Sequence, residues 1–193
     1  MSYYISSLCK SVNFQLRKIG LIRKYLTDEV AKTLITSLVL SRLDYCNSLL
    51  GGICIESLNR LQIIQNNAAR LVSKTKRYDH ITPVLKQLHW LPIKERIIFK
   101  HCLLCYKCLN GLAPLYLSDL IHIYHPRKSL RSSCDTTQLQ VPIKKYKFYG
   151  ERSFSFLGPV MWNKIPQNIR EATSLYSFKR QLKAFLFHQA YSC

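Results

Sequence analysis

Acidic residues are scarce in this chain of 193 residues, which has 10 Asp and Glu against 29 Lys and Arg and a formal net charge of +19. A hydrophobic content of 48% is ordinary for a globular protein and excludes a disordered basic tail. Because like charges on a compact body repel one another, we expect a polyanionic partner. Nucleic acid is the favoured polyanion. An anionic membrane surface and a role in solubility alone are the alternatives.

Long apolar runs are also missing. No run approaches the ~20 residues that span a bilayer, so we expect no membrane partner. The first residues, MSYYISSLCKSVNF, are too polar for the apolar core of a secretory signal. We therefore expect an intracellular protein, in the nucleus or cytoplasm and not secreted. Its eight cysteines are then expected to be mostly reduced thiols.

Catalytic motifs are the third absence. The sequence contains no phosphate-cradling glycine loop, no nucleophile elbow and no His-Glu metal helix. Asp44 is predicted to be a hydrogen-bonded structural carboxylate, with a catalytic or metal role as the alternative. Cys102, Cys105 and Cys108 have the spacing C-x2-C-x2-C, but on a helix their sulfurs would spread over ~120° of surface. We predict core thiols there and leave a metal site as the alternative. No catalytic residue, metal site, cofactor or small-molecule substrate is predicted.

The most regular apolar pattern lies between Thr33 and Val72 and predicts two amphipathic helices packed as an antiparallel hairpin. Gly51-Gly52 is expected to end the first helix, because glycine adopts a left-handed C-cap without steric cost. Two neighbouring stripes of the first helix are expected to form its core face: Ala31, Leu34, Leu38, Tyr45 and Leu49, and Ile35, Val39, Leu43, Cys46 and Leu50. The second helix is expected to bury Leu58, Leu61, Ile64, Ala68, Leu71 and Val72.

Periodicity and capping residues predict further helices over 5–26, 82–88, 93–110, 114–121 and 175–188. Thr27 and Ser174 are expected to be N-caps, and Gly111 is expected to close the helix 93–110. From about residue 126 the composition becomes more polar, and QLQVPI and YKFYGERSFSFLG predict two short strands that form a hairpin. Gly158-Pro159 is expected to end the second strand.

Several consecutive blocks resemble one protein family. They are SLVLSRLDYCNSLL (37–50), LNRLQIIQNNAARLV (58–72), YDHITPVLKQLHWLPIKERIIFK (78–100), YKCLNGLAPLYLSDL (106–120), YGERSFSFLGPVMWNKIPQNIR (149–170) and SFKRQLKAFLF (177–187). In this order they are similar to the carboxy-terminal region of reverse transcriptases encoded by jockey-like non-LTR retrotransposons. The similarity covers nearly the whole chain.

The resemblance implies a thumb-like region and the domain that follows it, from a polymerase that copies RNA into DNA. The fold it implies is mainly α, with a helical thumb-like bundle at 1–125 and a small α+β subdomain of one β-hairpin and a helix at 126–193. The family's polymerase palm holds two Mg²⁺ ions on an Asp-Asp pair, and this sequence has no such pair. Palm and fingers would lie upstream of Met1, and we expect them to be a partner of this chain. The chain alone is therefore expected to be no enzyme and to need no cofactor.

We expect such a region to bind RNA or an RNA–DNA hybrid through phosphate contacts. The predicted nucleic-acid-binding residues are Arg17, Lys18, Arg60, Arg70, Lys74, Lys76, Arg77, Lys144, Lys145 and Lys147. For the loop at 73–80 the alternative is a solvated surface. For residues 144–149 the alternative is a hairpin whose aromatic residues belong to the core. For the whole chain the alternative is a protein-interaction remnant of a decayed element, with no nucleic-acid role.

Overall fold

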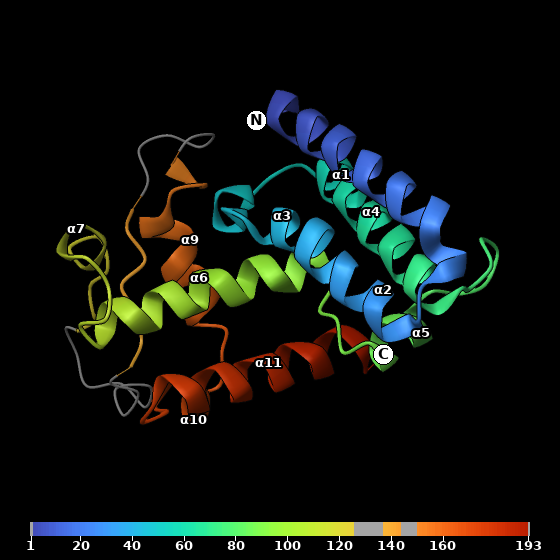
Figure 1. Ribbon diagram of the computed structural model, residues 1–193. Coiled ribbons are helices and arrows are strands. Elements are labelled where there is room, and N and C mark those ends of the chain that lie inside the picture. Colours follow the sequence, from blue (N-terminus) through green and yellow to red (C-terminus); the bar gives the residue numbers. More distant parts are fainter. Residues whose placement is uncertain (1, 126–136, 144–149, 193) are drawn as a thin grey trace. The chain divides into compact units, whose positions relative to one another are not determined.

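The computed structural model describes residues 2–125, 137–143 and 150–192 (Figure 1). The described residues are mainly helical, as predicted. They divide into two compact units. The first comprises residues 1–47, 53–96 and 189–193, and the second comprises 48–52 and 97–188. The predicted domain boundary between residues 125 and 126 stays a prediction, and the compact units group 97–125 with the residues that follow.

Three long helical stretches form the body of the first unit. They are α1 (Ser2–Ile22), α2 (Asp28–Ile35), which continues through a π-helical stretch (Thr36–Leu40) into α3 (Ser41–Asp44), and α4 (Ile55–Ser73). The short helix α5 (Thr82–Gln87) follows them. A 3₁₀ turn (Arg23–Tyr25) joins α1 to α2, and the Thr27 hydroxyl accepts a hydrogen bond from the Val30 amide, which confirms Thr27 as an N-cap.

Helices α1 and α4 lie side by side and run in the same direction (Figure 1). Helices α2 and α3, which come between them in the sequence, run in the opposite direction. Near the start of both helices, Arg60 donates a hydrogen bond to the Ser6 hydroxyl at 3.2 Å. Near the end of both, Arg23 donates to the Leu71 carbonyl at 2.6 Å. The unit is therefore a small helical bundle whose end is formed by the last turns of α1 and α4 and the first turn of α2.

The helix predicted up to Leu50 ends earlier, at Asp44, and this prediction was wrong about its last turn. Tyr45 is extended and Cys46 has a φ of 51°, so the chain turns before the glycine pair. Tyr45, Cys46 and Leu49 consequently lie exposed and not in the core. Of the first predicted stripe only Ala31 is buried, Leu34 is half-buried and Leu38 is exposed. The second stripe is buried at Ile35, Val39, Leu43 and Leu50, and Leu40, which belongs to neither stripe, is buried as well. Of the six α4 residues predicted to be buried, Leu61, Ile64, Ala68 and Val72 are buried, and Leu58 and Leu71 are half-buried.

Three glutamine and asparagine side chains of α4 fix the segment that leads into α6 (Ile93–Leu109). Gln65 is fully buried and donates to the Leu91 carbonyl at 2.8 Å, and Gln62 accepts from the Ile93 amide at 2.9 Å. Gln62 also donates to Gln65 and Asn66. The bond to Leu91 satisfies the buried side-chain amide of Gln65. The bond from Ile93 satisfies a backbone amide in the first turn of α6, and such amides have no partner within their own helix.

In its described residues, the second unit contains most of α6, α7 (Leu115–Ser118), α9 (Phe154–Trp162), α10 (Gln167–Arg170) and most of α11 (Leu175–Tyr191). Its core stacks Tyr106 on Phe178, with ring centroids 4.2 Å apart, and Trp162 on Phe178 at 5.7 Å. The Ser174 hydroxyl accepts from the Ser177 amide, as the predicted N-cap of α11 requires. Gly111 follows α6 with a φ of 66°, which confirms the predicted closure of that helix.

The second predicted strand was wrong from Phe154 onward, because Phe154–Trp162 is helical. Phe154, Leu157 and Met161 recur at helical spacing, and Gly158 and Pro159 lie buried inside the helix and do not break it. A side chain at Gly158 would meet the Cys105 sulfur at 2.9 Å, so glycine allows α9 to approach α6 closely. Within the described residues there is no sheet, and the only pairing is an isolated antiparallel bridge between Ile123 and Leu139. The β-hairpin is unconfirmed, and its residues 144–149 lie outside the described part.

Candidate nucleic-acid interface

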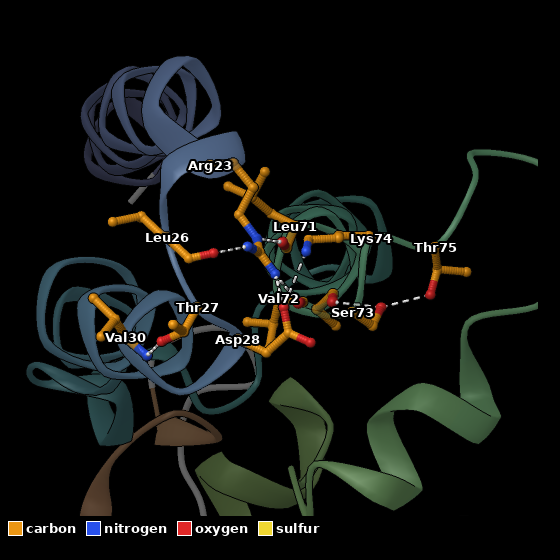
Figure 2. Close-up of polar contacts among 11 residues, drawn as sticks. Arg23, Leu26, Thr27, Asp28, Val30, Leu71, Val72, Ser73, Lys74 and Thr75 are labelled. Carbon is orange, nitrogen blue, oxygen red and sulfur yellow. Dashed lines mark hydrogen bonds and ion pairs between the residues drawn. The ribbon is translucent and has the colours of Figure 1, made fainter.

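The end of the first unit's bundle is held together by Arg23, a buried arginine that is 6% exposed (Figure 2). Its guanidinium donates to the Leu71 carbonyl at 2.6 Å, to the Val72 carbonyl at 2.7 Å and to the Leu26 carbonyl at 2.8 Å. Carbonyls in the last turn of a helix lack donors of their own and carry the negative end of its dipole. Arg23 therefore caps the end of α4 from the 3₁₀ turn that follows α1.

Asp28, in the first turn of α2, completes this arrangement. Its carboxylate accepts from Arg23 and lies 3.5 Å from the Lys74 ammonium (Figure 2). The hydrogen bond from Arg23, followed by the charge of Lys74, lowers the pKa of Asp28. Lys74 is the C-cap of α4 and has a left-handed φ of 56°. A left-handed residue reverses the direction of the chain, so the basic loop leaves α4 at this point.

The basic loop, residues 73–80, is folded by Arg70 and Asp79. Arg70 donates to the carbonyls of Lys76 and Asp79, at 2.6 and 2.9 Å, and the Asp79 carboxylate accepts from the Lys76 amide at 3.1 Å. Arg70 was predicted to contact phosphate, but its Nη1 atom already donates hydrogen bonds to backbone carbonyls of the loop. Lys76 and Arg77 are exposed, and their side chains form no ion pair with the described residues. Arg70 thus shapes the loop, while Lys74, Lys76 and Arg77 present its charge.

The other predicted residues of the first unit are placed along the two parallel helices. Arg17 and Lys18 are exposed on α1, one to two turns before the bundle end. Arg60 lies 14 residues before Lys74, about 21 Å away along α4 at ~1.5 Å per residue. The bundle end therefore brings together Lys74, Lys76 and Arg77 on one loop, while Arg17 and Lys18 lie on opposite sides of the exposed face of α1 one to two turns earlier, and Arg60 is not included.

Lys144, Lys145 and Lys147 lie outside the described residues, so their predicted role stays a prediction. Lys24 was missed, although it is exposed next to Arg23 at the same end of the bundle. In the helix predicted over 5–26, its seven-residue spacing from Arg17 would place both residues on one side, and this spacing was the available signal. No local sequence pattern predicts that Arg23 caps α4, because the carbonyls it binds lie 48 and 49 residues away in sequence.

Several acidic, thiol and imidazole side chains lie in packed surroundings. The Asp44 carboxylate accepts from Arg96 at 2.6 Å, which confirms a hydrogen-bonded structural carboxylate. Cys102, Cys105 and Cys108 are buried free thiols, as predicted, and burial raises the pKa of each. Burial also lowers the pKa of His101, whose Nδ1 lies 2.9 Å from the Ile97 carbonyl. Across residues 2–125, 137–143 and 150–192, no three His, Cys, Asp or Glu side chains gather as metal ligands.

Among the described helices, none combines the length and the apolar composition needed to cross a membrane. The charge of the first unit is strongly positive, with 15 Lys and Arg against six Asp and Glu, a net +9. Three of those six acids, Asp28, Asp44 and Asp79, are already engaged by the contacts above. Comparison with known proteins yields no matching family model, no matching curated protein and no matching solved structure.

Proposed function

We propose that this chain is a non-catalytic, nucleic-acid-binding region of an RNA-directed DNA polymerase of the non-LTR retrotransposon kind. Its ligand is RNA or the RNA–DNA hybrid of template and primer. Catalysis belongs to the palm of the same polyprotein, where two Mg²⁺ ions would be held. This chain contributes binding and no chemistry.

The observation that carries the proposal is the basic end of the first unit's bundle. Lys74, Lys76 and Arg77 are exposed on one loop, and Arg17 and Lys18 lie on the helix beside it. The loop is shaped by hydrogen bonds from Arg70 and by the Arg23 cap. Cations held on a folded loop lose little freedom when they bind phosphates, so they suit a polyanion better than cations on a mobile tail.

Phosphate contacts release counterions, and this gives the proposal its test. Each contact lowers the logarithm of the affinity by ~0.9 per decade of salt on a duplex. Five contacts therefore predict an affinity about 500-fold weaker at about 200 mM than at about 50 mM salt. Fluorescence anisotropy of the purified chain with a labelled RNA–DNA hybrid measures this change. No binding at the lower salt, or binding that ignores salt, would refute the proposal.

A competing outcome is binding by overall charge alone, and a polyanion without bases or sugars tests for it. Polyglutamate of matched length supplies negative charge on a flexible chain with a different charge spacing. We expect the hybrid to bind more tightly than polyglutamate at every salt concentration. Equal affinity for the two would mean that no nucleic-acid site exists.

A further inference from the structure

The outer face of α1 carries two rows of side chains that the proposed function does not use as a set. Tyr3, Phe14 and Tyr25 recur every 11 residues and are exposed, Phe14 by 55% and Tyr25 by 76%. Eleven residues make almost a whole number of α-helical turns, so Tyr3 and Phe14 lie on one line along α1. Tyr25 follows in the 3₁₀ turn that continues from α1. That line is opposite the side chains that α1 buries: Ile5, Cys9, Val12, Leu16 and Ile19.

The second row is cationic. Lys10 and Arg17 lie seven residues apart on α1, and Lys24 follows seven residues later in the 3₁₀ turn. All three are exposed, and Arg17 lies about 60° around the helix from Phe14. No Asp or Glu occurs before Asp28, so nothing acidic belongs to this helix. Lys18 lies on the other side of the ring row, with its ammonium 4.5 Å from the centroid of Phe14, and the Lys24 ammonium lies 4.8 Å from that of Tyr25.

Parallel rows of exposed rings and cations match the two parts of an unpaired polynucleotide. Bases in a single strand have free faces that stack on aromatic rings, while the phosphates run alongside and need positive charge. A duplex keeps its base faces stacked inside and offers the rings nothing. We propose that the outer face of α1 binds single-stranded nucleic acid, with unpaired bases stacked on Phe14 and Tyr25 and phosphates on Lys10, Arg17 and Lys24.

This inference rests on the proposed function, because it assumes that nucleic acid is the ligand of the chain. It adds which form of nucleic acid binds here and by which atoms. An anionic membrane would also be attracted to the cations. A membrane-surface helix, however, inserts a continuous apolar face, and α1 buries its continuous apolar face in the bundle. Leu21 and Ile22 are also exposed near the end of α1, by 73% and 45%, so this face is not made of rings and cations alone. The exposed cations on both sides of Phe14, Arg17 and Lys18, are what favours the polynucleotide.

The length of the ring row sets the size of the ligand. From Tyr3 to Tyr25 is 22 residues, about 33 Å at ~1.5 Å per residue. A strand with ~3.4 Å between nucleotides covers that distance with about ten nucleotides. We therefore expect the affinity for unstructured oligouridylate to rise with length up to about ten nucleotides and to level off beyond it.

The test removes the rings and leaves every charge in place. Phe14→Ala and Tyr25→Ala are each expected to weaken binding of a ten-nucleotide oligouridylate by about 5- to 150-fold, the range measured for lost base–aromatic stacking. The salt dependence should not change, because no cation is lost. Tyr116→Ala is the control: Tyr116 is 69% exposed on α7, with Asp119 and no cation within four residues of it. Far-UV circular dichroism checks that the helices persist in each variant.

A second readout reports stacking directly. Trp90 and Trp162 are buried, so Phe14→Trp introduces an indole that the oligonucleotide can reach while the native indoles stay shielded. We expect oligouridylate to quench that added fluorescence and an RNA–DNA hybrid to leave it largely unchanged. Absence of quenching by a bound oligouridylate would overturn the proposal.

The remaining outcomes separate this inference from the proposed function. Salt-dependent hybrid binding together with unchanged oligouridylate binding in both alanine variants refutes the single-strand site alone. Failure of the unaltered chain to bind either ligand refutes both. If the alanine variants instead lose binding to vesicles of anionic phospholipid, and not to oligouridylate, the face contacts a membrane and the single-strand site is refuted.

Discussion

Replacing Arg23 by Met tests whether one side chain secures the end of the first unit's bundle. The substitution keeps an unbranched apolar stem and removes the guanidinium that donates to the Leu71, Val72 and Leu26 carbonyls. The Val72 bond is buried, so its unsatisfied carbonyl costs about 1–3 kcal/mol. The other two carbonyls are partly accessible to water, and each lost bond costs about 0.5–1.5 kcal/mol. Desolvation of the arginine is relieved, so we expect a net loss of about 3 kcal/mol.

Native-state hydrogen exchange is the suitable assay, because it reports the opening of α4 without assuming that the two units unfold together. The amides of α4 should exchange about 150-fold faster in Arg23→Met at neutral pH, the factor that corresponds to about 3 kcal/mol. In Arg23→Lys, the exchange rate of the α4 amides should lie between those of the unaltered chain and of Arg23→Met. An ammonium keeps the positive charge but cannot donate several hydrogen bonds in the planar geometry of a guanidinium.

Lys24→Gln is the matched control, because it removes one positive charge from the neighbouring, exposed position. Asp28→Asn is a second control, since Arg23 keeps its three carbonyl acceptors when this exposed carboxylate is lost. Both should leave α4 exchange close to that of the unaltered chain. If Arg23→Met changes the opening free energy by less than about 0.5 kcal/mol, the range of ordinary surface substitutions, the Arg23 cap is not a stabilising feature.

Further predictions concern two glycines, the thiols and one histidine. Gly158→Ala should lower the free energy of unfolding by about 1–3 kcal/mol, because its methyl would meet the Cys105 sulfur at 2.9 Å. Gly20→Ala, whose methyl would make an ordinary 3.9 Å contact with Leu71 in the last turn of α1, should raise it by about 0.5–1 kcal/mol. Cys54 is exposed and its pKa is lowered by a hydrogen bond with Ser57, so a thiol reagent followed by mass spectrometry should label it before buried Cys102, and labelling of both at one rate would contradict this. The depressed pKa of buried His101 keeps it neutral when folded, so stability should fall as pH drops below about 6.5, by up to ~1.4 kcal/mol per unit, and His101→Gln should reduce that slope in pH-dependent urea titrations.

Helical periodicity predicted most of the fold because burial of an apolar stripe is a local, repeated signal. It placed α4 and its buried Leu61 and Ile64, and capping chemistry placed Thr27 and Ser174. It failed at Tyr45–Cys46, where a non-glycine residue adopts positive φ before the glycine pair that would have been the natural helix end. It failed again at Phe154, where alternating aromatic residues suggested a strand although Leu157 and Met161 continued a helix.

The candidate site was predicted only in part, because composition identifies charges and not their surroundings. Lys74, Lys76 and Arg77 are exposed as a phosphate-binding loop requires. Arg70 has the same charge but binds loop carbonyls, and Arg23 caps a helix distant in sequence. Whether an arginine faces solvent or a helix end depends on tertiary packing, which a single sequence does not display.

The central claim is that the basic loop of the first unit binds phosphates, and salt titration of two double variants tests it most directly. Lys76→Gln with Arg77→Gln removes two loop cations, and Lys179→Gln with Arg180→Gln removes two exposed cations from α11 in the second unit. On an RNA–DNA hybrid, the loop variant should show a salt slope shallower by about 1.8, at ~0.9 per contact, while the α11 variant keeps the slope of the unaltered chain. Equal slopes in the loop variant and the unaltered chain would contradict the claim.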